Sequence, residues 1–293
     1  MITAYAKAKL NLGLNIVGRR EDGYHLLDTV MQQIWLCDIL HLRRNPTETL
    51  EVTGGPPGED NLVWRAAALY RRHYGIGEGL SIRLEKVIPA GSGLGGGSSD
   101  AAATLVALDA LYGNATPLPR LQDWGESLGA DVPFALTGGA ARVTGIGEKA
   151  EPLESASPLY GVVLMSSFSL STPQVYSRYD KTRRDGSRAS IPGVIEGLRR
   201  GDPAKVSASL GNALEEPALE LAPELRRLAR ALESTRPLGI QMTGSGAAFF
   251  ALYADRTAAD RAAFSLRPAF PFVCSFETAP PGVPIVYPRG GIR

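Results

Sequence analysis

The sequence is poor in the residues that build disulfide scaffolds and metal clusters. Its 293 residues include two cysteines, Cys37 and Cys274, and three histidines. Two cysteines this far apart in the chain do not make a disulfide framework, and their scarcity is typical of a protein from a reducing cytoplasm. So few cysteines and histidines also argue against a dedicated zinc cluster.

The sequence also lacks an excess of charge of one sign and any long hydrophobic run. Its 31 basic and 30 acidic side chains leave a formal net charge of +1, so no global field favours nucleic acid or anionic lipid as a partner. No apolar run approaches the roughly 20 residues that span a bilayer, and the alternation around Lys7 and Lys9 differs from a secretory leader. We therefore expect a globular, cytoplasmic protein with no membrane and no nucleic-acid partner. No coiled-coil heptads occur, and we expect a monomer or a weak homodimer.

What the sequence does contain is a glycine-rich loop that runs into a helix. Five glycines occur within the seven residues 91–97, and an alanine-rich segment follows at 101–112. Ser98, Ser99 and Asp100 are good N-cap residues, so we expect the helix to begin at Ser99.

This arrangement predicts an anion seat, most simply for a polyphosphate such as that of ATP. The first turn of a helix offers free N–H groups and about half a positive charge. Glycines let the backbone approach a ligand without a Cβ in the way. The candidate ATP-binding residues of the loop are Pro89, Ala90, Gly91, Ser92, Gly93, Leu94, Gly95, Gly96, Gly97, Ser98 and Ser99.

Three known glycine-loop patterns compare differently with this segment. The P-loop needs a lysine after its last glycine, and here Ser98 follows Gly97. The dinucleotide fingerprint G-x-G-x-x-G occurs as Gly91, Gly93 and Gly96, but a proline interrupts before it and no buried strand is expected after the helix. The protein-kinase pattern fails because no H-R-D or D-F-G follows. A plain turn or linker stays open, although a linker has no reason to run into N-cap residues and an alanine-rich helix.

Alternating strand and helix patterns predict an α/β (α+β) protein of two domains. Residues 8–17 alternate with a period of two, which predicts a half-buried strand. Further strands are expected at 29–43, broken at Asp38, at 80–84, and at 161–165 in the middle of a sheet. Helices are expected at 61–74, 120–129, 204–214, 223–234 and 258–264. Residues 148–158 are rich in small, proline and acidic residues, so we expect an N-terminal ATP-binding domain at 1–155 and a C-terminal domain at 156–293.

Three segments together resemble the GHMP kinases (galactokinase, homoserine kinase, mevalonate kinase and phosphomevalonate kinase). Residues 89–99 are similar to the second family motif, Pro-x-x-x-Gly-Leu-Gly-x-x-Ser-Ser, residues 8–30 to the first and residues 241–250 to the third. The motifs stand in family order and span nearly the whole chain. The stretch Arg-Arg-Glu-Asp-Gly-Tyr-His in the first motif is similar to one member, which acts on a cytidine diphosphate derivative.

The resemblance implies both a fold and an activity. It implies a ribosomal-S5-like N-terminal half and a ferredoxin-like C-terminal half. It further implies transfer of the γ-phosphate of ATP to the tertiary 2-hydroxyl of 4-diphosphocytidyl-2-C-methyl-D-erythritol (a cytidine diphosphate methylerythritol), in the non-mevalonate route to isoprenoids. Mg²⁺ is expected because it neutralises ATP, and not because a ligand cluster is visible.

Two charged residues are the candidate catalytic pair. Lys9 lies on the polar face of the strand expected at 8–17, where an edge-strand lysine that keeps other sheets away is the alternative. Asp131 precedes a proline-started helix and, taken alone, is an N-cap carboxylate. The resemblance implies that Asp131 pairs with Lys9 and accepts the proton of the substrate hydroxyl, while Lys9 stabilises the attacking oxygen. Whether Asp131 acts as a base or as an orienting group stays open.

The tripeptide at 23–25 is the candidate reader of the substrate. An aromatic ring beside a two-faced hydrogen-bonding ring suits a nucleobase, and a core tyrosine with a solvated histidine is the alternative. The resemblance implies that Tyr24 stacks on the cytosine, that His25 hydrogen-bonds it, and that Tyr176 closes the other face. It also implies that Asn11 and Thr172 reach the methylerythritol or diphosphate part.

Further residues are candidates for contacts with the nucleotide, and some of them have a structural alternative. Asn61 and Lys86 are candidates for the adenosine side of ATP. Ser99 is a candidate contact for Mg²⁺ or phosphate, or a plain N-cap. Residues 244–246 either pack a tight loop against the phosphates or form a structural turn, and residues 181–188 are expected to form a solvated surface loop.

Three other functions stay open on the sequence. One is a GHMP kinase for a different small alcohol, which the stretch at 19–25 disfavours. Another is a dinucleotide-binding oxidoreductase built on Gly91, Gly93 and Gly96. The third is a non-catalytic nucleotide-binding protein, against which the presence of both Lys9 and Asp131 argues.

Overall fold

Two β-sheets and the helices that cover them make up the structure, a computed structural model that describes residues 1–47, 49–53, 58, 60–165, 167–182, 189–287 and 291–292. The first sheet has the order β12-β11-β1-β2-β4-β3, with β5 paired to β2 and to β6, and the second has the order β10-β7-β9-β8. The strands are β1 (Ile2–Arg19), β2 (His25–Arg44), β3 (Thr49–Thr53), β4 (Leu80–Glu85), β5 (Ala140–Gly145), β6 (Lys149–Leu153), β7 (Tyr160–Met165), β8 (Gly239–Met242), β9 (Phe249–Tyr253), β10 (Phe272–Glu277), β11 (Ile285–Tyr287) and β12 (Gly291–Ile292). The helices are α1 (Leu62–Tyr74), α2 (Gly96–Tyr112), α3 (Leu118–Glu126), α4 (Val132–Thr137), α5 (Thr172–Thr182), α6 (Ile191–Arg200), α7 (Pro203–Ala208), α8 (Glu215–Leu221), α9 (Arg226–Glu233) and α10 (Arg256–Leu266).

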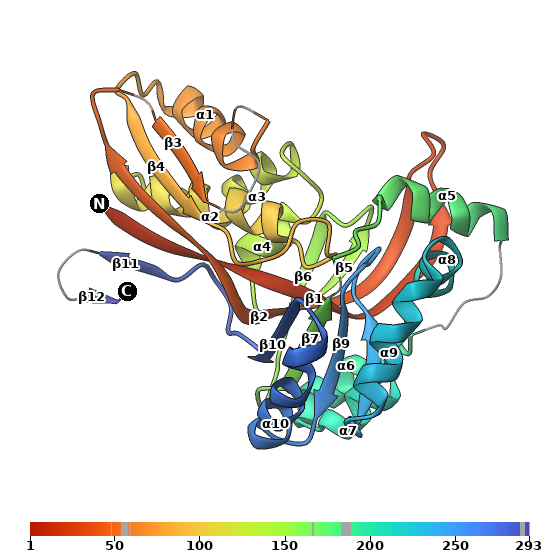
Figure 1. Ribbon diagram of the computed structural model, residues 1–293. Helices are drawn as coiled ribbons and strands as arrows, with labels where there is room; N and C mark the ends of the chain where they lie inside the picture. The colour runs from red at the N-terminus through yellow and green to blue at the C-terminus, as the bar shows by residue number, and fades with distance from the viewer. Residues whose placement is uncertain are drawn as a thin grey trace.

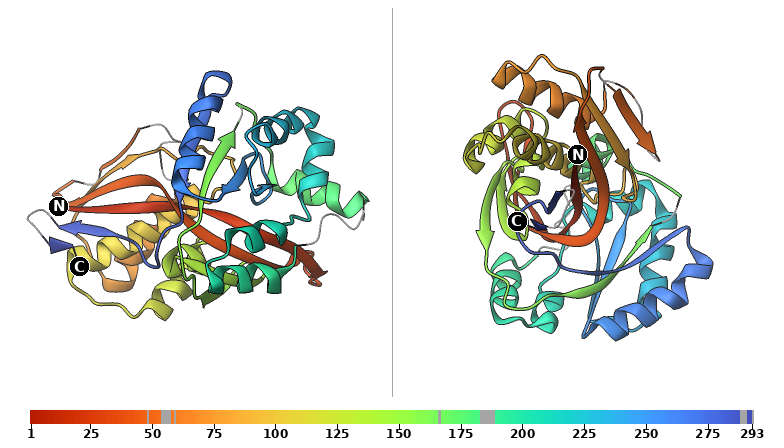
Figure 2. Two further views of the ribbon diagram at one scale, coloured as in Figure 1. Left: turned by 90° about the horizontal axis from the view of Figure 1, so that it is seen from below. Right: turned by 90° about the vertical axis from the view of Figure 1, so that its left-hand side faces the viewer.

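The long antiparallel hairpin of β1 and β2 connects the two lobes of the molecule. Figures 1 and 2 show it running from the lobe that carries α1 to α4 into the lobe that contains the second sheet. The strand expected at 8–17 is confirmed within β1, but it is not half-buried there. Lys9 and Asn11 on its polar face are only 5% and 1% exposed, like the leucines that alternate with them. The reason is that loops from both halves of the chain cover this stretch of β1, which brings polar side chains into the interior.

The N-terminal core forms where α1 and α2 pack on the sheet. Their small and aliphatic residues meet β1, β2 and β4 in one cluster that includes Tyr70 and Leu105, both fully buried. The helix expected at 61–74 is confirmed as α1. Asn61 caps it by accepting a hydrogen bond from the backbone N–H of Val63, and Gly75 ends it at φ +64°.

The second sheet has the strand order expected of a ferredoxin-like unit. Along the chain, β7, the helices α5 to α9, β8, β9, α10 and β10 follow one another, and all pairings in this sheet are antiparallel. β7 lies between β10 and β9, so the prediction of a mid-sheet strand at 161–165 is confirmed. Phe249 and Phe250 on β9 are fully buried.

The predicted break at Asp38 is wrong, because β2 continues through it. Asp38 is fully buried, and its carboxylate accepts hydrogen bonds from the backbone N–H groups of Val87 and Ile88 and from the Lys86 ammonium. A buried carboxylate with this many donors costs far less than an unpaired one. Sequence patterning could not reveal these partners, since they follow β4, well beyond Asp38 in the chain.

Two helix boundaries also differ from prediction. The helix after the glycine loop begins at Gly96 and not at Ser99, with Gly95 as its N-cap at φ +72°. The helix expected at 204–214 ends at Ala208, because the residues beyond it pair with β1: Leu14 donates its backbone N–H to Gly211 and accepts one from Ala213.

The last strands of the chain return to the first sheet. β11 pairs with β1 and β12 pairs with β11, and Figure 1 shows them beside the N-terminal end of β1. The domain boundary near residue 155 stays a prediction. Among the helices of the described residues, none has the length and apolar character needed to span a bilayer.

Candidate active site

The glycine loop and the start of α2 line a cavity of about 390 Å³. No described side chain caps α2 at Gly95, so the N–H groups of its first turn stay available to an anion. The lining residues are Asp60, Asn61, Leu62, Lys86, Ile88, Pro89, Ala90, Gly91, Ser92, Gly93, Gly95, Gly96, Gly97, Ser98 and Asp100. Leu94 packs in the core instead, and the Ser99 hydroxyl donates to the backbone carbonyl of Lys7 at 2.7 Å. The glycine loop therefore lines a cavity, with Ser98 and not Ser99 at its surface, and its role in binding ATP stays a prediction.

The glycines serve the close approach of the loop to the rest of the protein. Gly93 has φ +76°, and a Cβ there would lie 2.2 Å from the carbonyl oxygen of Thr243. Gly95 has φ +72°, and a Cβ there would lie 2.9 Å from Cγ of Lys9. Backbone hydrogen bonds fasten the loop on both sides, from Lys9 to Leu94 and from Ala248 to Ser92. Glycine is needed at these positions because any side chain would push the loop away from β1 and from the loop between β8 and β9.

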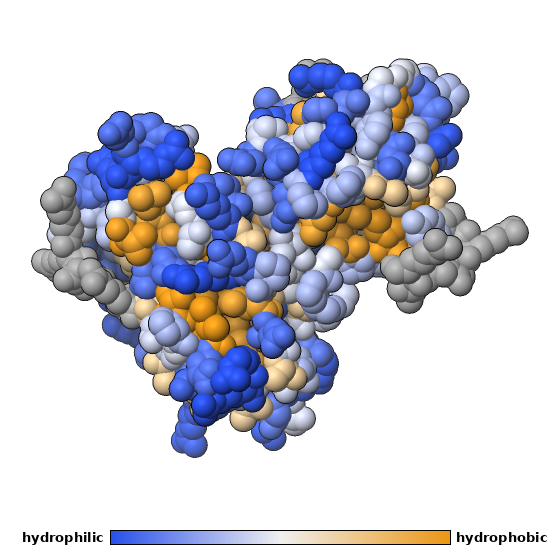
Figure 3. All heavy atoms as spheres, turned by 180° about the vertical axis from the view of Figure 1, so that it is seen from behind, coloured by the Kyte–Doolittle hydropathy of each residue, from blue (hydrophilic) through white to orange (hydrophobic). Residues whose placement is uncertain are grey.

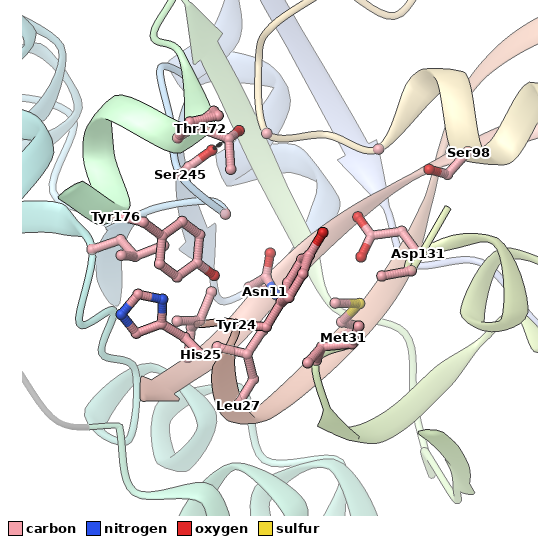
Figure 4. Close-up of a pocket in the computed structure, with 18 of the residues that line it drawn as sticks. Asn11, Tyr24, His25, Leu27, Met31, Ser98, Asp131, Thr172, Tyr176 and Ser245 are labelled. Carbon is pink, nitrogen blue, oxygen red and sulfur yellow. Dashed lines mark hydrogen bonds between the residues drawn. The ribbon is translucent and has the colours of Figure 1, made fainter. Parts of the chain in front are cut away.

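A second, larger cavity of about 910 Å³ lies next to the first. Figure 4 shows Asp131 and Ser98 on one side of it and Tyr176, His25, Thr172 and Ser245 on the other. Its lining residues are Lys9, Asn11, Leu14, Arg19, Asp22, Gly23, Tyr24, His25, Leu27, Met31, Gly93, Gly95, Ser98, Ala130, Asp131, Ile146, Thr172, Pro173, Tyr176, Ser177, Asp180, Leu214, Gly244 and Ser245. Every residue predicted to bind the acceptor substrate is among them.

The two cavities share Gly93, Gly95 and Ser98. These residues are the end of the glycine loop and the first turn of α2. An anion held by the helix N-terminus therefore lies at the boundary between the cavities. A group in the larger cavity can reach it there without crossing protein.

Lys9 and Asp131 meet beside this boundary. Nζ of Lys9 lies 3.9 Å from Oδ2 of Asp131 and donates to Oδ1 of Asn11 at 2.7 Å. Asn11 is held in turn by a hydrogen bond to the Thr29 hydroxyl at 3.0 Å. Burial lowers the pKa of Lys9 below its usual value, and the Asp131 carboxylate opposes that shift. The side chain of Asp131 is 33% exposed to the cavity, which leaves it open to a ligand.

The loop at 243–246 packs against the glycine loop and reaches the larger cavity. The Thr243 hydroxyl accepts the backbone N–H of Asn11, and the Ser245 hydroxyl lies 2.7 Å from that of Thr172. Asn212, which sequence reasoning placed in a helix, holds this loop by donating to the backbone carbonyls of Met242 and Gly244. The loop therefore has a structural role, and Gly244 and Ser245 also line the cavity.

Aromatic rings surround the far end of the larger cavity. His25 stacks on Tyr176 with ring centroids 4.9 Å apart, whereas Tyr24 is 61% exposed and, in the view of Figure 4, is drawn between this pair and Asp131. Burial, and then the charge of Asp131, raise the pKa of Tyr176 above its usual value, so the phenol stays neutral. Sequence reasoning missed Asp180, which hydrogen-bonds His25 at 2.7 Å. Its position four residues after Tyr176 on a helix was the available signal.

Lys86 lies between two buried carboxylates at the edge of the smaller cavity. Its ammonium pairs with Asp38 and with Asp100, the latter at 2.6 Å. Burial raises the pKa of Asp100 to about 8, with Lys86 opposing the shift and Asp38 adding to it. Lys86 is thus engaged in the fold, and with Asn61 it lines the smaller cavity, whereas Asp131 lines the larger one. Lys86 and Asn61 both stay candidates for the adenosine side.

Mg²⁺ fits the site in the form that accompanies a nucleotide. Within the described part of the chain, no group of three or more histidine, cysteine or acidic side chains could hold a metal ion alone. Mg²⁺ commonly needs only one or two protein oxygens besides phosphate and water. The Asp131 carboxylate and the Ser98 hydroxyl, which both line the larger cavity, are oxygen donors of the right kind.

Known families match most of the folded chain. Residues 61–139 match the family described as "GHMP kinases N terminal domain", and residues 194–271 match "GHMP kinases C terminal".

Individual relatives agree with these matches. The chain is 41% identical over 271 residues to the 4-diphosphocytidyl-2-C-methyl-D-erythritol kinase of Pelotomaculum thermopropionicum, covering 91% of this chain and 94% of the relative. It is 42% identical over 262 residues to the protein of the same name from Thermus thermophilus, covering 89% and 91%. A solved structure, "Crystal structure of 4-(cytidine 5'-diphospho)-2C-methyl-D-erythritol kinase", superposes with a TM-score of 0.82 at 39% identity, covering 95% of this chain and 99% of that one.

Proposed function

The chain belongs to the GHMP kinases, and from that membership we propose that it transfers the γ-phosphate of ATP to the 2-hydroxyl of 4-diphosphocytidyl-2-C-methyl-D-erythritol, giving the 2-phosphate and ADP. The substrate is the one named in its relatives at 41% and 42% identity. The reaction belongs to the non-mevalonate synthesis of isoprenoid precursors. A cytoplasmic location and a monomeric or weakly dimeric state stay predictions.

One observation carries the proposal: the two cavities meet at Gly93, Gly95 and Ser98, beside Lys9 and Asp131. A kinase must hold a nucleotide and an alcohol separately and bring only the γ-phosphate and the hydroxyl together. The smaller cavity suits the nucleotide because the open N-terminus of α2 faces it. The larger cavity suits the alcohol because it contains the acid–base pair and the aromatic end.

Phosphoryl transfer requires positioning and charge stabilisation more than covalent chemistry by the protein. The acceptor oxygen forms a bond to the γ-phosphorus as the bond to the β,γ-bridging oxygen breaks, and ADP leaves. The first-turn N–H groups of α2 stabilise the phosphate charge. Lys9 stabilises the attacking oxygen, and Asp131 takes or orients the hydroxyl proton. When bound with ATP, Mg²⁺ neutralises the phosphate charge as it develops.

The aromatic end of the larger cavity suits the cytosine. Tyr24 and Tyr176 both line the cavity, and His25 stacks on Tyr176. A planar base between two tyrosines is stabilised by stacking. Thr172 and Asn11 line the same cavity, and Asn11 accepts a hydrogen bond from Lys9, so we assign them to the diphosphate and methylerythritol part.

The dinucleotide alternative loses its structural basis. That fingerprint needs a strand after the helix, ending in an acidic residue that binds the ribose. Here α2 is followed by α3.

An acceptor panel tests the proposal. Protein, Mg-ATP and a set of alcohols are incubated, ADP release is followed, and NAD(P)H absorbance is monitored in parallel. We expect ADP only with the cytidylated substrate, and a new phosphomonoester in the ³¹P spectrum. ADP release with homoserine or mevalonate instead, or a change in NAD(P)H absorbance, would contradict the proposal.

A further inference from the structure

One face of helix α5 holds the imidazole of His25. Tyr176, Tyr179 and Asp180 stand at positions i, i+3 and i+4, so they point the same way from the helix. Tyr176 stacks on the His25 ring with ring centroids 4.9 Å apart, and Tyr179 meets that ring edge-on with centroids 5.9 Å apart. The Asp180 carboxylate accepts a hydrogen bond from Nε2 of His25 at 2.7 Å. The ring is therefore fixed in plane, in rotation and in its hydrogen bonding by a single helix.

The hydrogen bond to Asp180 selects which nitrogen of His25 bears the proton. A carboxylate only accepts hydrogen bonds, so Nε2 must carry the hydrogen. An imidazole with one proton then has its lone pair on Nδ1. Within the described residues, Nδ1 of His25 has no hydrogen-bond partner. The ring lines the larger cavity and presents an acceptor there.

Arg19 keeps Asp180 in place. Its Nη1 lies 3.5 Å from Oδ2 of Asp180, and its Nε donates to the carbonyl of Gly23 at 3.0 Å. Arg19 thus connects the turn that carries Tyr24 and His25 to the helix that carries Tyr176.

An acceptor at this position distinguishes two kinds of pyrimidine. Cytosine carries an exocyclic amine, which donates a hydrogen bond, whereas uracil carries a carbonyl oxygen at the same place, which accepts one. A hydrogen-bond acceptor on His25 binds the amine of cytosine and is repelled by the carbonyl oxygen of uracil. A buried polar group that forms a hydrogen bond with one ligand, and is left without a partner by the other, discriminates strongly between the two ligands.

We propose that Asp180 is a positioning residue that sets the tautomer of His25, and that this tautomer lets the site accept an amino-substituted pyrimidine and reject an oxo-substituted one. This inference rests on the proposed function, because it assigns the base end of the same cavity. Asp180 does not touch the substrate in this account. It acts through His25.

The test compares cytidine and uridine diphosphate forms of the methylerythritol substrate. We expect the wild-type protein to favour the cytidine form, and Asp180→Asn to lower the ratio of the two kcat/KM values by about tenfold or more. An amide can donate as well as accept, so it no longer imposes one tautomer. The loss should appear mainly as a higher KM for the cytidine form, with kcat less affected, because Asp180 is remote from Lys9 and Asp131.

Glu220→Gln is the matched control. Glu220 also forms an ion pair with α5, through Arg178 at 2.6 Å, and neither residue lines the larger cavity. This variant should keep the wild-type ratio. An equal fall of the ratio in both variants would mean that loosening the helix, and not the tautomer, changes selectivity, and it would overturn the proposal.

A spectroscopic readout does not depend on turnover. The chain has three histidines, so long-range ¹H–¹⁵N spectra of histidine-labelled free protein at pH 8 can be assigned residue by residue. We expect His25 to carry its proton on Nε2 in the wild type and to become a mixture in Asp180→Asn. A proton on Nδ1 of His25 in the wild type would overturn the role of Asp180 without affecting the proposed function. Turnover by Asp180→Asn with an unchanged ratio of the two kcat/KM values would do the same. A wild-type protein that phosphorylates neither substrate overturns the proposed function itself.

Discussion

At the scale of single residues, buried charge is the feature that most separates this chain from an ordinary α/β protein. Lys7, Lys9, Asp38 and Asp100 are each at most 5% exposed. A buried charge is costly unless partners stabilise it. Lys9 and Asp100 line the two cavities, whereas Lys7 lines neither. The cost of burying Lys7 can therefore be measured apart from activity.

Lys7 makes stability depend on pH in a defined direction. It donates to the carbonyl of Pro280 and lies 5.4 Å from the ring centre of Trp35, yet burial lowers its pKa from 10.5 to about 8. Between these values the unfolded chain binds the proton and the folded chain does not, so the free energy of unfolding rises with pH. We expect the wild type to gain up to about 3 kcal/mol relative to Lys7→Met between pH 8 and pH 10.5, measured by urea unfolding.

An exposed lysine provides the comparison. Lys149→Met, on the surface of β6, should follow the wild-type pH profile. If Lys7→Met also ran parallel to the wild type over this range, Lys7 would not be a lysine with a lowered pKa.

At this scale, the sequence identified the residues that line the cavity better than the residues that hold them in place. Lys9, Asp131, Asn11, Thr172 and Tyr176 all line the larger cavity, because motifs preserve the residues that touch ligands. The partners that hold them come from distant segments. Asn212 acts through contacts that no local pattern encodes, and for Asp180 the local signal is its position four residues after Tyr176.

At the scale of elements, the glycine loop has to fit closely between β1 and the loop that joins β8 to β9. A glycine can serve a loop in three ways: by adopting a positive φ, by allowing a close approach of another group, or by adding flexibility. Gly93 meets the first two conditions at once, since it lies against Thr243 with φ +76°. Gly97, within the first turn of α2, meets neither.

This contrast predicts opposite effects of the same substitution. Gly93→Ala should lower the free energy of unfolding by about 2 kcal/mol or more, since its Cβ would clash with the Thr243 carbonyl and φ is unfavourable. Gly97→Ala should be neutral or stabilising by up to about 1 kcal/mol, because the nearest atom to its Cβ is Cδ1 of Leu62 at 3.5 Å. Urea unfolding of the two variants measures both. Equal destabilisation would show that the loop is not held against Thr243.

Elements with strong local periodicity were predicted correctly, and errors fell where tertiary contacts override it. The helix α1 and the strands β4 and β7 follow from their patterns. The break at Asp38 was wrong because three distant donors satisfy that carboxylate. The helix beyond Ala208 was wrong because its residues pair with β1. The stretch 183–188 of the expected surface loop lies outside the described residues.

At the scale of the whole molecule, both halves contribute to one site. The smaller cavity is built by the N-terminal half, from the segments around Asn61, Lys86 and the glycine loop. The larger cavity also takes Thr172, Tyr176 and Ser245 from beyond residue 155. The β1–β2 hairpin runs through both lobes (Figure 1), and its first strand carries Lys9.

Figure 3 shows apolar areas separated by hydrophilic side chains on the face seen from behind, and exposed large apolar residues such as Val17, Leu118 and Phe264 stand far apart in the sequence. Scattered exposed apolar residues are normal on a folded protein. The site, by contrast, concentrates its polar groups where the two cavities meet.

The central claim is that Lys9 and Asp131 act on a phosphate and an alcohol that meet at this junction. Rapid-quench single-turnover transfer from γ-labelled ATP to the cytidylated substrate tests it most directly. The account predicts that Lys9→Ala and Asp131→Asn each slow the transfer by about 10²- to 10⁴-fold, while a non-hydrolysable ATP analogue and the substrate still bind. Transfer within a few-fold of the wild-type rate in both variants would contradict it.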